Sequence, residues 1–494
     1  MKFKAIFAIF VGFVLSSASC SKEDKQKSDD ENNGTPPING DVLIYTTTTD
    51  QSHDFNTSYV DMVEGSSLSP QRISIDASES YQTIHGFGAA ITGSSCYNLL
   101  QMSPKDRTTF LKQTFSPEEG MGYSYVRIAI GCSDFSVNGE YSCCDTKGIE
   151  NFALPAEDHT YIIPILNEIL AINPDLKIMG SPWTPPQWMK VNNLTDLQPH
   201  NSWTSGQLKP AYYKDYATYF VKWIQAYTSL GFNITSVTPQ NEPLNRGNSA
   251  SLFMGWQEQQ QLVIEMGKQF EAAGLKTKIY AFDHNYNYDN MPDQEDYPLK
   301  IYENEIAKSY LSGAAYHNYG GNKSELLDIH SKVPDKELVF TETSIGEWND
   351  GRNLKVRLMS DMEEIGLGTL NNWCQAVIVW NLMLDKNKGP NNDGGCTTCY
   401  GAVDIDLDYR TITRNSHYYV IGHLASVIKP GALRIKSSGF TANGLDYAAF
   451  KNTDGTTAVV LMNKANENRK ITLNDGNKYF AYEVPANAVV SYLW

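Results

Sequence analysis

The feature that most constrains the fold is a regular alternation of short β-branched runs with longer helical stretches. Eight strand-like runs lie between residues 84 and 384, at 84–91, 125–131, 177–182, 234–241, 278–285, 314–319, 338–343 and 376–384. Helix-like segments separate them, and those at 212–231 and 257–274 each end at a glycine, which suits a helix C-terminus. This alternation predicts an α/β fold, specifically a (β/α)8 TIM barrel. A doubly wound sheet is the alternative, but the glycine-rich phosphate fingerprint is absent.

The pattern changes toward both ends of the chain. Period-two runs separated by Gly, Asn and Asp predict short antiparallel strands at 41–48, 72–79, 445–452, 457–465, 469–474 and 488–494. We therefore expect an accessory β-sandwich built from both chain ends. The predicted divisions are a signal peptide, a disordered linker, the first part of the sandwich, the catalytic barrel and the rest of the sandwich, at 1–20, 21–40, 41–81, 82–425 and 426–494.

The N-terminus has the pattern of a targeting segment. Lys2 and Lys4 precede an apolar run that is too short to span a bilayer, and small residues then lead to Cys20. This arrangement resembles a bacterial lipoprotein lipobox, so cleavage would leave Cys20 as a lipid-bearing N-terminus. We expect a secreted protein anchored in the bacterial cell envelope, at the outer membrane or cell surface. An ordinary secretory signal with an incidental cysteine is the alternative.

Charge and cysteine content exclude several classes of function. The net charge of −16 over 494 residues argues against nucleic acid and against charge-driven adhesion to acidic lipid. Cys396 and Cys399 form a lone CxxC, and no second ligand pair at zinc spacing accompanies them. A local disulfide or two free thiols is the expected state, and no metal is predicted. The pairing of the other cysteines stays open: Cys96, Cys132, Cys143, Cys144 and Cys374.

Two glutamates follow predicted strands, Glu242 after ITSVTPQN and Glu342 after LVFT. A carboxylate at the end of a buried strand is costly to place unless something uses it. The C-terminal ends of barrel strands meet at one face, so both carboxylates are expected there. Such a pair suggests hydrolysis of a glycosidic bond. The same predicted face gathers further polar and aromatic residues: Trp183, Asn241, His317, Tyr319 and Trp380.

Several strings in barrel order resemble glycoside hydrolase family 30, the glucosylceramidase-like enzymes. They include GFGAAITGSS at 86–95, the run to CSDFS at 120–136, SPWTPPQWMK at 181–190, PQNEP at 239–243 and WNLMLDKNKGPN at 380–391. The resemblance implies a barrel with a β-sandwich, retention of anomeric configuration, and neither metal nor cofactor. It makes Glu242 the acid/base and Glu342 the nucleophile.

The resemblance also implies supporting roles. Asn241 would contact the sugar 2-hydroxyl, Trp183 and Trp380 would stack on substrate, and His317 and Tyr319 would bind or orient. Arg127 on the second strand should pair with a carboxylate, near Glu342. Asp134, in CSDFS, resembles a family structural residue, with a loop cap as the alternative. A retaining mechanism needs carboxyl groups about 5–5.5 Å apart, and an acid/base needs a raised pKa.

One departure bears on the substrate. Glucosylceramidases carry an aspartate after the GFG string where this chain has Gly93. Loss of that acceptor weakens selection of a chain end and could make room for a further sugar, although Asp283, His284 or another loop residue could replace it. We therefore expect a monomeric endo-β-1,6-glucanase whose partner is carbohydrate. The alternatives are an exo-acting glucosylceramidase or β-glucosidase, a β-xylosidase or β-fucosidase, and an inactive glycan-binding surface lipoprotein.

Overall fold

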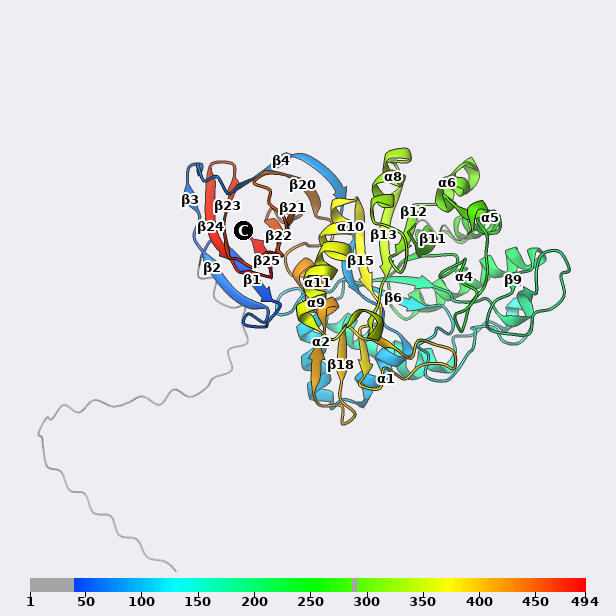
Figure 1. Ribbon diagram of the computed structural model, residues 1–494. Coiled ribbons are helices and arrows are strands. Elements are labelled where there is room, and N and C mark those ends of the chain that lie inside the picture. The colour runs from blue at the N-terminus through cyan, green and yellow to red at the C-terminus, as the bar shows by residue number, and fades with distance from the viewer. Residues whose placement is uncertain (1–39, 287–290) are drawn as a thin grey trace, which may run out of the picture. The chain divides into compact units, whose positions relative to one another are not determined.

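The computed structural model describes residues 40–286 and 291–494, and the eight predicted runs form one parallel sheet in it (Figure 1). Neighbours in this sheet, in order, are β5 (Gly86–Ala89), β15 (Cys374–Val379), β13 (Glu337–Glu342), β12 (Gly313–His317), β11 (Lys278–Asn285), β10 (Ile234–Val237), β7 (Lys177–Ser181) and β6 (Tyr125–Ala129). A parallel bridge between Ala90 and Arg127 joins the two ends of the sheet. The sheet therefore closes into a barrel, and the predicted fold class is confirmed.

Helices follow the strands along the chain. Their bounds are α1 (Gly93–Gln101), α2 (Pro104–Phe115), α3 (Ile163–Ile172), α4 (Tyr213–Ser229), α5 (Trp256–Ala272), α6 (Tyr297–Tyr302), α7 (Glu305–Tyr310), α8 (Ser324–Lys332), α9 (Leu354–Asp361), α10 (Leu367–Asn371) and α11 (Ser416–Ala425). The two helices predicted most clearly are α4 and α5. The chain leaves them at Gly231 and Gly274, whose φ angles of 93° and 67° are left-handed and favour glycine.

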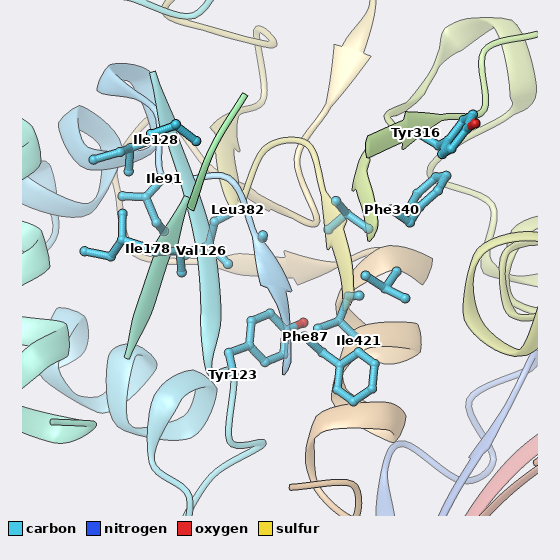
Figure 2. Packing of buried hydrophobic residues seen from close by; sticks show 14 of the residues in the cluster. Phe87, Ile91, Tyr123, Val126, Ile128, Ile178, Tyr316, Phe340, Leu382 and Ile421 are labelled. Atoms are coloured by element: carbon cyan, nitrogen blue, oxygen red, sulfur yellow. The ribbon is translucent and has the colours of Figure 1, made fainter. Parts of the chain in front are cut away.

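Alternate side chains of each barrel strand face opposite ways. In β6, Val126 and Ile128 belong to the large hydrophobic cluster between strands and helices, part of which Figure 2 shows. Tyr125 belongs instead to a smaller cluster inside the barrel. Because side chains alternate with a period of two, Arg127 faces the same interior as Tyr125. A guanidinium there needs a carboxylate partner, and the site supplies it.

Strands from both chain ends form a second sheet, blue and red in Figure 1. Its ten strands, in sheet order, are β2 (Asn56–Val60), β1 (Val42–Thr48), β25 (Ala488–Leu493), β22 (Thr457–Asn463), β21 (Leu445–Lys451), β20 (Leu433–Gly439), β4 (Arg72–Thr83), β23 (Arg469–Asp475), β24 (Lys478–Val484) and β3 (Val63–Glu64). The β20–β4 pair has register shifts of the kind that β-bulges produce. The second sheet has a hydrophobic core of its own, which includes Ile44, Ile73 and Val459. The period-two pattern does not predict β2, β3, β20 or β24.

The cysteines fall into two groups. Cys396 and Cys399 form a disulfide with Cα atoms 5.8 Å apart, one of the two states expected for the CxxC. The other described cysteines are buried thiols. Among the helices of the described ranges, none is long and apolar enough to cross a membrane. Residues 1–39 lie outside the described residues, and with them the predicted signal peptide, Cys20 and nearly all of the linker.

Candidate active site

Glu242 and Glu342 line the same cavity at the C-terminal ends of the barrel strands. The cavity has a volume of about 340 Å³, and we call it the carboxylate cavity. Glu242 follows β10 and is 5% exposed, while Glu342 ends β13 and is 6% exposed. Two other cavities in the described residues, of about 260 and 440 Å³, hold no carboxylate pair. The chemistry of the lining, rather than its size, therefore singles out this cavity.

Arg127 joins the groups behind the cavity. Its Nη1 donates to Glu342 Oε2 at 2.5 Å, and its Nη2 donates to Asp283 Oδ2 at 2.8 Å and to Asn241 Oδ1 at 2.7 Å. The guanidinium is fully buried, so these contacts supply the partners that a buried cation requires. Arg127 thus orients both the Glu342 carboxylate and the Asn241 amide, next to Glu342 as the sequence predicted.

Asp283 is the hub of this network, a role that sequence reasoning missed. Strand β11 shifts register between Phe282 and His284, and Phe282 and Asp283 have φ angles of 72° and 67°. The irregularity turns Asp283 into the barrel, as β-bulges near active sites do. Its oxygens also accept from three hydroxyls, those of Ser181, Thr238 and Thr341. Burial acts to raise the pKa of Asp283, but Arg127 and His317 outweigh it and hold that pKa well below the usual range.

Both carboxylate oxygens of Asp283 already accept hydrogen bonds from protein groups. Asp283 therefore does not serve as the substrate acceptor that Gly93 lacks. That expectation from sequence is wrong for Asp283. His284, the other candidate, does line the carboxylate cavity. The only signal in the sequence for the hub was an aspartate near the end of a predicted strand.

His317 connects Glu242 to this hub. Its Nδ1 lies 3.2 Å from Glu242 Oε1, and its Nε2 lies 3.1 Å from Asp283 Oδ1. The other oxygen of Glu242 accepts from the side-chain amides of Asn245 at 2.7 Å and Asn248 at 3.0 Å. Both carboxylate oxygens of Glu242 are therefore held in place, one by an imidazole and one by two amides.

This geometry sets the protonation of the pair. Burial acts to lower the pKa of His317, but the charge of Glu342 and the bonds to Asp283 and Glu242 raise it to about 9. Burial acts to raise the pKa of Glu242, but the hydrogen bond from His317 and the charges of His284 and His317 lower it to about 2. The direction for Glu242 is opposite to the raised pKa expected from sequence, because the adjacent His317 imidazole holds the proton.

Glu342 is contacted from two sides. Tyr319 donates its hydroxyl to Oε1 at 3.1 Å, opposite the Arg127 contact at Oε2. Burial raises the pKa of Glu342, the charge of Glu242 adds to the rise, and the charges of His317 and Arg127 limit it. The carboxylate is thus fixed in orientation by one phenol and one guanidinium.

Glu242, His284 and His317 offer ligand atoms within 4.8 Å of one another. Both nitrogens of His317 already face carboxylate oxygens, so a metal ion bound by His317 would have to break one of these contacts. The donor set is better suited to sharing a proton.

The predicted binding residues divide into two layers. Tyr319 and Trp380 line the carboxylate cavity. Trp183 is stacked on Trp380 with ring centroids 4.9 Å apart, and the Arg127 guanidinium lies 5.0 Å from the Trp183 ring. Trp183, Asn241 and His317 are not part of the lining. Trp183 contacts Trp380 and His317 contacts Glu242, which both line the cavity, while Asn241 contacts Arg127 behind it. Trp183 was expected to stack on substrate, but in the structure its ring stacks on Trp380.

The sequence predicted a structural role or a loop cap for Asp134. In the structure Asp134 lines the carboxylate cavity. Within the described residues, its Oδ1 has no hydrogen-bond partner. Burial, reinforced by the charges of Glu342 and Glu242, raises the pKa of Asp134 well above its usual value. The Asp134 residue lines the cavity while this oxygen is itself buried, so a ligand hydroxyl that reached it would supply the partner that it lacks.

The space beside Gly93 is already filled. A Cβ atom at Gly93 would lie 1.9 Å from Glu157 Oε1. The backbone N–H groups of Val137 and Asn138 donate to the Glu157 carboxylate at 3.0 and 2.9 Å and hold it there. The expectation that Gly93 makes room for a further sugar is therefore wrong, because the Glu157 side chain occupies that room.

Comparison with known proteins covers most of the chain. Residues 84–428 match the model of the glycosyl hydrolase family 30 TIM-barrel domain. Residues 431–492 match that of the glycosyl hydrolase family 30 beta sandwich domain.

Relatives match over similar lengths. An endo-1,6-β-D-glucanase of Neurospora crassa is 32% identical over 83% of this chain and 85% of its own. The lysosomal acid glucosylceramidase of Mus musculus is 26% identical over 85% of this chain and 83% of its own. Among solved structures, the endo-β1,6-glucanase BT3312 superposes with a TM-score of 0.91 at 62% identity, covering 92% of this chain and 99% of that one.

Proposed function

The chain belongs to glycosyl hydrolase family 30, and from that premise we propose that it is a retaining endo-β-1,6-glucanase. One observation carries the substrate: 62% identity over 92% of the chain to a solved endo-β1,6-glucanase. An exo-acting glucosylceramidase is the second candidate, supported by the 26% identity to the mouse enzyme. A purely glycan-binding role would need neither of the two buried glutamates.

In the proposed double displacement, Glu342 is the nucleophile. Its carboxylate attacks the anomeric carbon, and the bond from that carbon to the glycosidic oxygen breaks. Arg127 and Tyr319 hold the two carboxylate oxygens, so the attacking group is oriented before substrate arrives. Water then attacks the glycosyl-enzyme ester at the anomeric carbon and restores the carboxylate.

Glu242 acts as acid and then as base. As the glycosidic bond breaks, the leaving oxygen takes a proton from Glu242, and His317 supplies that proton across the 3.2 Å contact. In the second step Glu242 accepts a proton from the attacking water, and the proton returns to the pair. Esterification of Glu342 removes the charge that most raises the pKa of His317, so the pair gives up its proton more easily as the ester forms.

The remaining residues of the cavity recognise the sugar. Trp380 offers an aromatic wall, and the Asp134 side chain in the lining is the proposed contact for a sugar hydroxyl. Asn241 lies behind the lining, where Arg127 fixes its amide, and it is the proposed partner of the 2-hydroxyl.

Product analysis tests the substrate. The purified protein is incubated with β-1,6-glucan, β-1,3-glucan and an aryl β-glucoside. A ladder of oligosaccharides from β-1,6-glucan supports the proposal. Release of monosaccharide alone, or cleavage of only the aryl glucoside, would favour the exo-acting candidate.

The Glu342→Ala variant tests the nucleophile. It should lose turnover, and added azide should restore cleavage and give a glycosyl azide of inverted configuration. Near-normal turnover without azide would show that Glu342 is not the nucleophile.

We further propose that Cys20 carries a lipid and that the mature protein is a monomer anchored in a bacterial envelope. The lipobox-like sequence supports the anchor. Expression in a bacterium that processes lipoproteins should place the wild type in the membrane fraction and Cys20→Ala in the soluble fraction. Light scattering of a form that starts after the linker should give the mass of one chain, and a larger mass would contradict the monomer.

A further inference from the structure

Trp348 lines the carboxylate cavity and yet is 53% exposed. The other tryptophan of the lining, Trp380, is 2% exposed. The cavity thus has one indole ring at its buried floor and another at its open mouth. The Trp348 ring also packs over Gly346, where a Cβ atom would lie 2.0 Å from a ring carbon. Gly346 therefore allows a ring position that any other residue would obstruct.

The turn that carries Trp348 is fastened to a neighbouring strip of chain. Strand β14 (Ile345–Gly346) pairs with β17 (Cys399–Tyr400), and the Glu347 N–H donates to the Thr398 carbonyl at 3.0 Å. The Glu347 carboxylate also pairs with Lys388 at 2.6 Å. These contacts fix the backbone of the turn from which the exposed indole projects.

The Cys396–Cys399 disulfide lies within that strip. Both cysteines line the carboxylate cavity, and Thr398, which accepts from Glu347, lies between them. The disulfide closes the loop whose last residue, Cys399, pairs with Gly346. It therefore constrains the backbone on which the Trp348 turn rests.

We propose that Trp348 is a platform for a second glucosyl unit of the glucan chain, and that the Cys396–Cys399 disulfide positions this platform. The proposal rests on the proposed glucanase function and extends it to a subsite outside the two glutamates. The C–H face of a glucosyl ring is apolar and suits an exposed indole. A β-1,6 linkage includes an exocyclic CH2 with an extra rotatable bond, so the next sugar is set off from the one at the floor. A platform at the mouth suits that offset.

The experiment compares Trp348→Ala, Cys396→Ser/Cys399→Ser and the triple variant on two kinds of substrate. One is a series of β-1,6-linked glucooligosaccharides, and the other is an aryl β-glucoside with a single sugar. We expect Trp348→Ala to lower kcat/KM on the oligosaccharides about 10-fold, mainly through KM, and to lower it on the aryl glucoside by a clearly smaller factor. The cysteine pair should give a smaller loss of the same kind, and the triple variant no more loss than Trp348→Ala.

Two further measurements separate binding from folding. Calorimetry with the oligosaccharides on the Glu342→Ala background should show the same weakening when Trp348 is replaced. Leu327→Ala, a change at a similarly exposed apolar residue outside the cavity lining, is the matched control and should change neither activity. Reductant should lower oligosaccharide activity in the wild type and have no effect on the cysteine variant.

Equal losses on both substrates, or no loss on the oligosaccharides, would overturn the platform. Full additivity of the cysteine and tryptophan changes would overturn the positioning role of the disulfide. If the wild type cleaves another β-linked series instead of the β-1,6 series, the proposed function fails. The length dependence on that other series then tests the platform by the same criteria.

Discussion

Replacing His317 by asparagine tests how the acid/base obtains its proton. In the wild type, the pair of Glu242 and His317 keeps one proton up to the pKa of His317, about 9. Asparagine can still donate a hydrogen bond to one carboxylate, but it does not titrate. Glu242 then loses the imidazole that lowers its pKa, and burial raises that pKa. The proton is then held by a carboxyl group alone and is lost at a lower pH than in the wild type.

The magnitude follows from the contribution of general acid catalysis, about 10²- to 10⁴-fold. At pH 8 we expect kcat on a β-1,6-linked oligosaccharide to fall by about 10²-fold or more, because its sugar leaving group must be protonated. An aryl glucoside with a strongly acidic phenol leaves without protonation, so its cleavage rate should change only a few-fold. The basic limb of the kcat/KM profile for the oligosaccharide should move from near pH 9 toward acid pH.

The assay is a pair of pH–rate profiles on these two substrates, with Tyr319→Phe as a control. Tyr319 contacts Glu342 and not Glu242, so its removal should slow both substrates without moving the basic limb. An unmoved basic limb in His317→Asn would refute the reasoning. Equal losses on the two substrates would do so as well, because they would indicate general damage to the site.

Three other predictions concern buried carboxyl groups. Burial raises the pKa of Asp158 to about 7 despite a hydrogen bond from Tyr227, so the fold loses stability as pH rises from about 4 to 7. Asp158→Asn should remove that loss, which is a few kcal/mol of unfolding free energy at most. The melting temperature of the variant minus that of the wild type should therefore rise from about pH 4 to about pH 7 and then level off. A difference that stays constant with pH would contradict the assignment. Gly93→Asp should displace Glu157, because a side chain at Gly93 would overlap its carboxylate. It should therefore lower the melting temperature, and by more than Gly93→Ala does. An unchanged melting temperature would show that the site can relax. Asp134→Ala should lower kcat/KM about 10- to 100-fold at an unchanged melting temperature, with Asp134→Asn less affected, and a normal kcat/KM for the alanine variant would exclude contact with substrate.

Periodicity predicted the barrel because each strand is buried on both faces and is bounded by a helix. The same reasoning placed Glu242 and Glu342 at one end of the barrel, since parallel strands bring their C-termini together. Arg127 was predictable as well, because a buried guanidinium needs a carboxylate. These inferences depend on properties of single strands, and a short stretch of sequence is enough to show such properties.

The hub at Asp283 was not predictable in this way. It depends on an irregularity in β11 that moves one side chain into the barrel, and no local pattern marks that shift. The space beside Gly93 is another case, since Glu157 fills it from a distant part of the chain. The pKa of Glu242 likewise depends on His317, which a different strand supplies. Such features arise from tertiary packing.

The pairing of β1 with β25 has a consequence for the order in which the protein is made. Strand β1 is synthesised before the barrel, yet one of its partners, β25, is synthesised after it. The β1 edge that pairs with β25 therefore stays unpaired until the barrel has been synthesised. An open strand edge is prone to pair with another chain. A chain cut before residue 488 lacks β25, so β1 would keep one open edge and the second sheet would stay incomplete.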